Sequence, residues 1–268
     1  MDRCLLIINQ LIFILILSLS SVYIQADPLR PDQRSRDKKN ETVESKKISE
    51  DLVKWPRANL YEFGLHFSNS RIDGFRISNN TKGTLSSGLN MAVSIQYFNW
   101  RKREYDFSVG LNLESIQMSA ELASIPIDNS QVMAIGLNVM GRYLVYDNLY
   151  LKSQIGLQDK LFYANSGFTG YEISKSMLPF VQIGFSTLFA EIMKIKIGFE
   201  GNAYLYQSAS VANYKIDTGQ GYDVKIFSMW PRGTNQIITE FFYNGRTQDT
   251  ELIRTAEQKI GFGVKYQF

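Results

Sequence analysis

The chain ends in Ile260-Gly261-Phe262-Gly263-Val264-Lys265-Tyr266-Gln267-Phe268, and this stretch decides the fold. Apolar side chains occupy every second position, with glycine or a polar residue at each position between them. Successive side chains of a β-strand point to opposite faces, so a period of two places all the apolar side chains on one face. The stretch therefore predicts a strand with one apolar face that ends on an aromatic residue.

The same alternation runs through the chain from Asn59 onward. Seven earlier runs place apolar residues mainly at alternate positions: 61–67, 89–97, 105–113, 135–145, 149–157, 181–189 and 195–203. The positions between them are mostly polar residues or glycine, for example Asn90, Ser94 and Gln96 in the second run. The pattern predicts a series of strands that each have an apolar and a polar face.

A different pattern opens the chain. Asp2 and Arg3 precede an apolar run from Cys4 to Val22, which leads to a small residue at Ala26. This order is typical of a secretory signal peptide over residues 1–26 that is cleaved after Ala26. A retained membrane anchor is the alternative, because the run is about long enough to span a bilayer. Cleavage would remove the lone cysteine, and with it disulfides, cysteine metal sites and cysteine nucleophiles.

Residues 27–58 form a charged segment before the first strand. Residues 27–57 hold nine Lys/Arg and seven Asp/Glu, and no aromatic residue precedes Trp55. Such a segment buries too little apolar area to offset its ordering entropy. We expect it to be a periplasmic leader, in the form of a solvated tether.

Composition narrows the class of protein further. Beyond residue 26 no segment approaches 18 consecutive apolar residues, so no further transmembrane helix is expected. The chain contains 15 Tyr and 17 Phe. This abundance of aromatic residues suits a transmembrane barrel, which has aromatic girdles at both membrane interfaces. The formal net charge of +3 is too small to indicate a nucleic-acid partner.

The closing strand resembles that of small bacterial outer-membrane β-barrels. In that family the closing strand is an insertion signal for the barrel-assembly machinery, and the resemblance implies this role for Phe262, Val264, Tyr266 and Phe268. It also implies an all-β, antiparallel up-and-down transmembrane barrel over residues 59–268, located in the bacterial outer membrane. Outer-membrane lipid and lipopolysaccharide would contact the apolar faces, and the polar faces would line the lumen. The oligomeric state is not indicated.

The strand count depends on residues 209–257. Segments 222–226 and 236–243 both look like strands, separated by residues 231–234. If both cross the membrane the barrel has ten strands, which equal spacing favours; otherwise it has eight strands and a long extracellular hairpin. Short periplasmic turns are expected at 100–104, 147–148 and 190–191, and long loops at 69–87, 119–131, 163–176 and after Ser208. Aromatic girdle residues are expected on the short-turn side: Trp100, Tyr105, Tyr143, Tyr146, Tyr150 and Phe268.

Charged residues on the polar faces are the candidate site residues. They are Asp106, Glu114, Arg142, Lys152, Lys160, Lys196, Glu200, Glu240 and Lys265. Side chains fill the interior of narrow barrels, and unpaired buried charges are costly. We expect a core of ion pairs in a non-enzymatic surface or structural protein. The alternative is a narrow channel for small polar solutes, lined by the same residues.

A third hypothesis concerns His66, the single histidine, and Ser68. At strand spacing they share a face with Glu62, and a hydroxyl beside a base can become a nucleophile. His66-Phe67-Ser68-Asn69 is similar to a stretch of the outer-membrane lipid A deacylases, which implies a hydrolase. That family carries the stretch late in the chain, and here no orienting Glu lies between Ser68 and Glu104. One histidine and no mature cysteine argue against a metal site, and no cofactor is indicated.

Overall fold

The computed structural model describes residues 61–76, 82–101, 104–120, 130–165, 171–211, 214–251 and 253–268. Within these residues the structure is built of strands and turns, and no helix long and apolar enough to cross a membrane occurs. The predicted signal peptide and charged leader lie outside the described residues.

Thirteen strands are described, most of them long. Their bounds are β1 Tyr61–Arg76, β2 Lys82–Ser87, β3 Asn90–Arg101, β4 Tyr105–Ala120, β5 Ser130–Tyr146, β6 Leu149–Asn165, β7 Tyr171–Ile192, β8 Ile195–Tyr206, β9 Ala209–Val211, β10 Tyr214–Ile216, β11 Gly219–Arg232, β12 Asn235–Asp249 and β13 Ile253–Gln267. All of them pair antiparallel with their neighbours.

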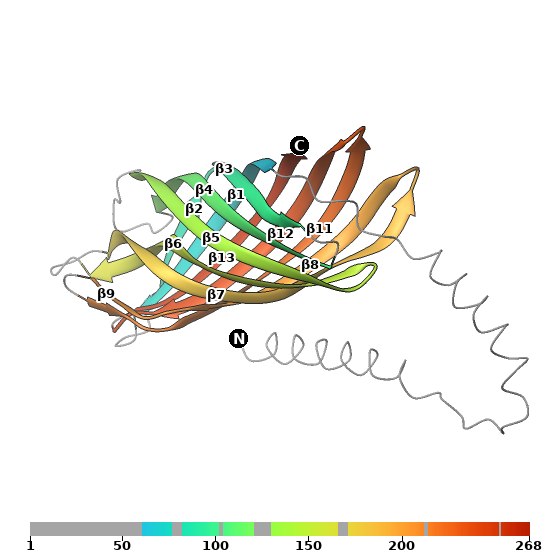
Figure 1. The fold of residues 1–268 in the computed structure, drawn as a ribbon. Coiled ribbons are helices and arrows are strands. Elements are labelled where there is room, and N and C mark those ends of the chain that lie inside the picture. Colours follow the sequence, from blue (N-terminus) through green and yellow to red (C-terminus); the bar gives the residue numbers. More distant parts are fainter. Residues whose placement is uncertain are drawn as a thin grey trace, which may run out of the picture. The chain divides into compact units, whose positions relative to one another are not determined.

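Ten of the described strands form a closed ring (Figure 1). The ring runs β1-β3-β4-β5-β6-β7-β8-β11-β12-β13, and β13 pairs with β1 to close it. The short β2 lies beyond the end of β3, between β1 and β4. β9 and β10 form a separate two-stranded sheet. The prediction of ten strands is confirmed, and the eight-strand alternative is wrong, because β11 and β12 belong to the wall.

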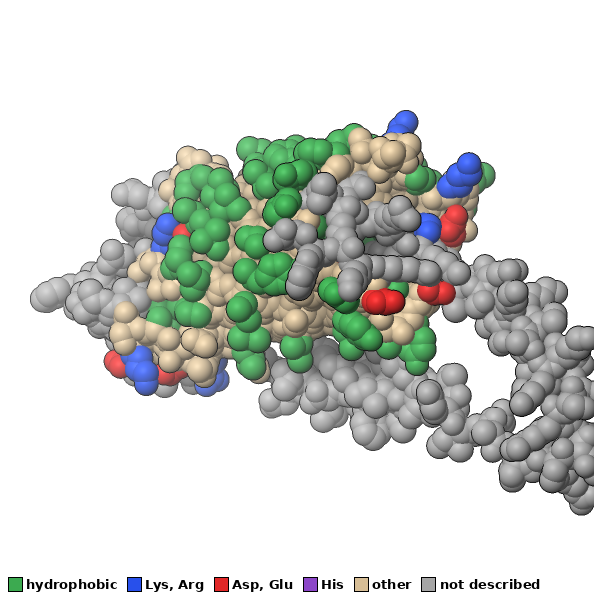
Figure 2. Space-filling model, viewed as in Figure 1, with side chains coloured by type: hydrophobic (Ala, Val, Ile, Leu, Met, Phe, Trp, Pro, Cys, Tyr) green, Lys and Arg blue, Asp and Glu red, His purple; other side chains and the backbone are tan. Residues whose placement is uncertain are grey.

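The outer face of the wall is apolar. The apolar residues of the alternating runs point outward, and many are well exposed. Ile183, Phe241 and Ile260, for example, are 65%, 70% and 63% exposed. Figure 2 shows hydrophobic side chains over the visible face of the wall, with charged side chains toward its ends. The buried polar residues lie on the opposite face of the same strands. A water-soluble barrel would have the reverse arrangement, so these apolar faces meet lipid.

Several predicted boundaries are wrong because pairing continues beyond the membrane-crossing part of the strands. The predicted loop 69–87 is mostly β1 and β2, and 163–176 includes the ends of β6 and β7. Backbone groups stay satisfied by continuing the ladder, which the polar composition of these segments does not reveal. The turn expected at 190–191 lies instead at Met193 and Lys194, where φ is 51° and 70°. Positive φ at both positions suits the twist of a two-residue hairpin.

The short-turn end carries an aromatic cluster on its outer face. Tyr61 lies 5.1 Å from Tyr97 and 5.7 Å from Phe268, ring centre to ring centre. Tyr143, Tyr146 and Phe268 are exposed, as expected for a girdle. Tyr150 is buried and contacts a lumenal arginine, so its assignment to the girdle is wrong. The alternation along β6 already places Tyr150 on the inward face, because the next residue, Leu151, points outward.

Candidate functional site: the lumenal cavity

The inward faces of the wall strands surround a cavity of about 340 Å³. Charged side chains of both signs line it. Its carboxylates are Glu62, Glu114, Asp159, Glu200, Asp223, Glu240 and Glu257, and its cations are Arg142, Lys152, Lys160, Lys225, Lys259 and Lys265. The two signs nearly balance, so the cavity lining has no strong net charge.

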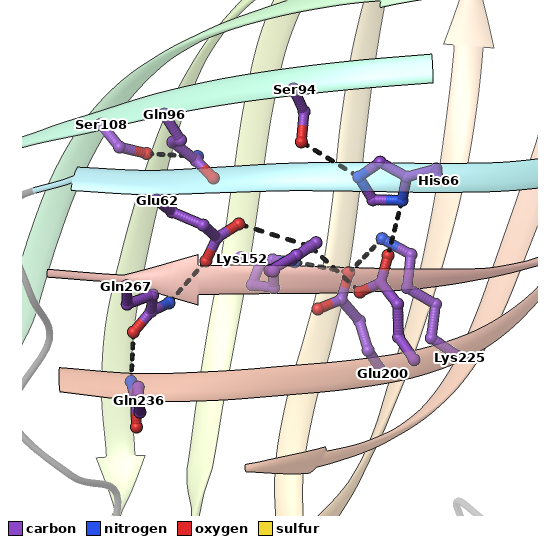
Figure 3. Close-up of polar contacts among 12 residues, drawn as sticks. Glu62, His66, Ser94, Gln96, Ser108, Lys152, Glu200, Lys225, Gln236 and Gln267 are labelled. Atoms are coloured by element: carbon purple, nitrogen blue, oxygen red, sulfur yellow. Dashed lines mark hydrogen bonds and ion pairs between the residues drawn. The ribbon is translucent and has the colours of Figure 1, made fainter. Parts of the chain in front are cut away.

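Glu200 on β8 is the centre of the first group of ion pairs (Figure 3). Its Oε1 lies 2.6 Å from Lys152 Nζ and 3.3 Å from Lys225 Nζ. Lys225 also lies 3.5 Å from Asp223, and Asn202 donates hydrogen bonds to both Glu200 and Asp223. Removing these charges from water costs free energy, which such close pairing offsets.

Lys265 on β13 joins a second group. Its Nζ lies 3.0 Å from Glu240 Oε2 and 3.4 Å from Glu62 Oε1. Glu62 also accepts a hydrogen bond from Gln267, which in turn accepts one from Gln236 (Figure 3). This chain of polar contacts reaches the short-turn end of the lumen, because Gln267 is the last residue of β13.

Arg142 and Asp106 form a bidentate pair nearer the short turns. Arg142 Nε and Nη2 each donate to a different Asp106 oxygen at 2.7 Å. The guanidinium carbon also lies 5.0 Å from the Phe98 ring centre and 5.4 Å from that of Tyr150. Two parallel hydrogen bonds between two aromatic rings fix the guanidinium in one position.

The loop end is held by Arg246 on β12. Its Nε donates to Glu257 at 2.8 Å, and its Nη2 donates to the backbone oxygen of Leu161 at 3.0 Å. The guanidinium carbon lies 4.9 Å from the Phe162 ring centre. Leu161 and Phe162 belong to β6, which is several strands away around the ring, so these contacts cross the lumen.

The C-terminal end of β6 and the N-terminal end of β7, both on the loop side, leave the wall and cover the lumen. β5 pairs with β6 only as far as Gly136–Gln158, whereas β6 continues to pair with β7 as far as Asn165–Tyr171. We call the paired residues 159–165 of β6 and 171–177 of β7 the β6–β7 hairpin. β6 comes within 8 Å of β13, Cα to Cα, although these strands lie on opposite sides of the ring.

Apolar residues pack beneath and beside the β6–β7 hairpin. One buried cluster contains Ile72, Leu85, Ile116, Met118, Ala134, Leu161 and Ile253. A second contains Phe162, Leu178, Phe180, Tyr206 and Ile216. The lining of the cavity includes Glu62 and Gln267 at the short-turn end, and Ile116, Leu161 and Tyr206 of the apolar clusters at the other end. The cavity therefore reaches toward the short turns and ends against the apolar clusters.

The structure brings together most of the predicted lumenal charges. Asp106, Glu114, Arg142, Lys152, Glu200, Glu240 and Lys265 all lie in interior ion pairs, Glu114 with Lys259. Lys160 lines the cavity, with Nζ 5.2 Å from the Tyr206 ring centre. Lys196 does not line it; its Nζ lies 3.8 Å from Glu191 near a short turn.

Sequence reasoning missed further interior charges: Asp223, Lys225, Arg246, Glu257 and Lys259. The signal for two of them was available, because Asp223 and Lys225 alternate with the outward Tyr222 and Val224. Arg246 and Glu257 lie beyond the regular apolar runs, where no period marks the inward face. Phe262, Val264, Tyr266 and Phe268, assigned to the insertion signal, are exposed on the outer face.

His66 lies in this cavity but its partners differ from those expected. Its Nε2 lies 3.0 Å from Ser94 Oγ (Figure 3), and its Nδ1 lies 3.2 Å from Glu240 Oε1. Ser68 is buried on the same strand, two residues away. The acid that the local sequence lacked is Glu240 on β12, which is far from His66 in the sequence but only two strands along the ring. Among the described residues, no group of three or more His, Cys, Asp or Glu side chains could hold a metal ion.

Comparison with known proteins finds likeness in structure alone. No protein-family model matches the sequence, and no curated protein matches it significantly. The outer-membrane protease OmpT of Escherichia coli is 11% identical, with 82% of this chain and 100% of that chain covered and a TM-score of 0.40. An outer-membrane channel of Pseudomonas putida is 10% identical, with 81% of this chain and 97% of that chain covered and a TM-score of 0.44. The translocator domain of the autotransporter NalP of Neisseria meningitidis is 12% identical, with 88% of this chain and 98% of that chain covered and a TM-score of 0.31.

Because these scores are low, the class of the protein is defined by its own geometry. A closed antiparallel ring satisfies its backbone polar groups internally, and an apolar outer face surrounds a polar interior. The protein is a transmembrane β-barrel of the bacterial outer-membrane type, and the outer membrane is its location.

Proposed function

We propose that this protein is a non-conducting outer-membrane barrel with a surface or structural role, and that its lumen is closed on the loop side. The observation that carries the proposal is the β6–β7 hairpin, which leaves the wall and packs across the lumen. Outer-membrane lipid and lipopolysaccharide would surround the apolar face, and the barrel-assembly machinery would insert the chain through its closing strand.

The interior charges support a closed lumen. A conducting pore keeps charged side chains hydrated along an aqueous path, whereas here they pair with one another across the interior. Lys259 pairs with Glu114, and these residues lie on β13 and β4. Lys152 and Lys225 share Glu200. Such pairing offsets the cost of burial but leaves few charges to attract a passing ion.

Planar-bilayer recording of the purified protein tests the proposal. The full-length barrel is expected to give no conductance steps. In a shortened variant, Asn-Gly would replace residues 161–175 and join Lys160 to Ser176, which are partners in the β6–β7 ladder. Asn-Gly suits a two-residue hairpin turn, so the wall can stay paired. Removal of the covering segment is expected to produce conductance steps.

Met177→Ala is the matched control, because it removes one exposed side chain of the same hairpin and leaves the backbone in place. It is expected to stay silent. Conductance by the unaltered protein would favour the narrow-channel alternative. A shortened barrel that shows the heat-dependent gel shift of a folded barrel but remains silent would show that the hairpin is not what closes the lumen.

A further inference from the structure

Three side chains in the cavity form a connected acid–base–hydroxyl series. Glu240 Oε1 lies 3.2 Å from His66 Nδ1, and His66 Nε2 lies 3.0 Å from Ser94 Oγ. The side chain of His66 is 16% exposed and that of Glu240 is 5% exposed. All three residues line the cavity, and Figure 3 shows the Ser94 hydroxyl beside the His66 imidazole, joined to it by a dashed line.

Strand register brings the three residues together. His66 is the direct partner of Gly263 on β13, and Gly263 is in turn the partner of Glu240 on β12. A Cβ on Gly263 would lie 2.6 Å from His66 Nδ1, so glycine leaves the imidazole room to reach across β13 to Glu240. Gly64 leaves room in the same way on the β3 side of the imidazole, for the contact between His66 and Ser94. It is the partner of Ser94, and a Cβ there would lie 2.4 Å from Ser94 Oγ.

The hydrogen-bond chemistry fixes the direction of the series. An ionised carboxylate can only accept, so the hydrogen between Glu240 and His66 belongs to Nδ1. In the neutral imidazole Nε2 is then an acceptor, and the Ser94 hydroxyl donates to it. This is the arrangement in which a base can take the proton of a serine nucleophile while an acid holds the base in the required tautomer.

We propose that Ser94, His66 and Glu240 form a nucleophilic site that hydrolyses small carboxylic esters. Ser94 Oγ attacks the ester carbonyl carbon, and its proton passes to His66 Nε2. The C–O bond to the alcohol breaks, and the departing alkoxide takes that proton. Water then attacks the acyl-serine with His66 again as the base, releasing the carboxylic acid and restoring Ser94.

A candidate for stabilising the oxyanion lies next to the nucleophile. Asn112 on β4 is the direct partner of Ser94 on β3, and its side chain also lines the cavity. Directly opposed side chains in antiparallel strands have Cβ atoms about 4.5–5.5 Å apart. A side-chain amide N–H at that position can donate to the negative charge that develops on a carbonyl oxygen during attack.

The cavity limits the substrate to a small, polar ester. A volume of about 340 Å³ is near the lower end of small-molecule sites, and its lining is charged. The substrate would enter from the short-turn side, where the cavity reaches Glu62 and Gln267. This inference goes beyond the proposed function, because a lumen closed on the loop side can still admit a molecule from the other end. It replaces the expectation that the barrel is non-enzymatic.

The experiment uses the folded full-length barrel in detergent and two probes, a small fluorophosphonate and 4-nitrophenyl acetate. Mass spectrometry is expected to find the phosphonyl group on Ser94. Ser94→Ala is expected to abolish labelling, and His66→Gln is expected to lower ester turnover by about 10²–10⁴-fold, the range of general acid–base catalysis. Gel mobility before and after boiling confirms that each variant is folded.

Ser68→Ala is the matched control, since Ser68 is also buried and inward-facing on the strand that carries His66. It is expected to keep full labelling and turnover. A folded, unlabelled wild-type barrel would overturn the proposal, as would labelling that persists in Ser94→Ala. The bilayer recording is independent of both probes, so failure of this site and failure of the closed lumen give different results.

Discussion

The two ends of the barrel are built differently. At the loop end, the β6–β7 hairpin crosses the lumen above two apolar clusters and is held by Arg246. At the short-turn end, two-residue turns join strands that stay in the wall, and the inward side chains include the paired Gln236 and Gln267. The loop end has the larger apolar core, and the short-turn end combines paired polar side chains with a smaller buried apolar cluster, Leu188, Phe227, Met229 and Ile238.

This difference shows that the two ends depend on different forces. The loop end is stabilised by burial of apolar side chains and of one arginine network, so single substitutions there should have large effects. The short turns themselves are stabilised mainly by local backbone geometry, so substitutions in these turns should have small effects. Substitutions in the lipid-facing middle of the wall should have effects of intermediate size.

The largest effect is expected from Arg246→Ala at the loop end. The Arg246 side chain is 1% exposed, and its removal would leave Glu257 buried without this partner and break the bond to Leu161. Loss of one partner of a buried ion pair costs about 3–5 kcal/mol. Urea unfolding of the barrel in detergent micelles would measure the change in the free energy of unfolding.

Arg254→Ala is the control at the same end of the barrel. Arg254 pairs with Asp249 at 3.2 Å, but its side chain is 58% exposed. Exposed pairs contribute about 0–1 kcal/mol, so the loss should be small. If the two variants lost equal stability, the loop end would not have the buried arginine network described here.

An intermediate effect is expected from Ile155→Lys on the outer face. Ile155 is exposed on the wall part of β6, where it lies between Val139 and Val181 in the register. A lysine on the lipid face costs about 2–4 kcal/mol near the bilayer midplane and about 0–1 kcal/mol near the interface. The measurement is the free energy of unfolding from lipid vesicles.

Tyr146→Lys is the paired substitution, at an equally exposed position beside the Asp147–Asn148 turn. It should cost less than Ile155→Lys in vesicles. Equal costs, or a cost-free Ile155→Lys, would contradict the placement of lipid around the middle of the wall.

The smallest effects are expected in the short turns. Lys194 has φ of 70° and Gly233 has φ of 65°. A side chain in the left-handed region costs about 1–2 kcal/mol, part of which glycine loses again through its greater freedom in the unfolded chain. Lys194→Gly should therefore stabilise the barrel by up to about 1 kcal/mol, and Gly233→Ala should destabilise it by about 1 kcal/mol. Thermal gel-shift curves would detect both signs, and a stabilising Gly233→Ala would contradict the turn geometry.

Much of the fold could be predicted from periodicity. The runs from Tyr61 to Phe67 and from Ile260 to Phe268 have the predicted outward faces, and β11 and β12 lie in the wall, as their spacing favoured. Strand ends were less predictable, since the ladder continues into polar segments. Tyr150 was misplaced because it was assigned to the girdle by its nearness to a turn, although its alternation with the outward Leu151 puts it on the inward face.

The candidate site could be predicted in part only. The inward positions of Glu200, Glu240 and Lys265 follow from alternation with apolar neighbours. The partners of His66 do not, because Ser94 and Glu240 are far from it in the sequence. The sequence suggested Ser68, the nearest hydroxyl on the same face, whereas the register places Ser94 beside the imidazole.

The sequence by itself determined the class of the protein, because a period of two assigns each side chain to a face, and lipid requires the apolar face to be outside. Tertiary structure decided which inward side chains meet, and that the β6–β7 hairpin covers the loop end. The physical reason is that alternation specifies the face of a strand but carries no information about the residue across the ladder. Closure of β13 onto β1 sets that neighbour, and it places Glu240, His66 and Ser94 side by side.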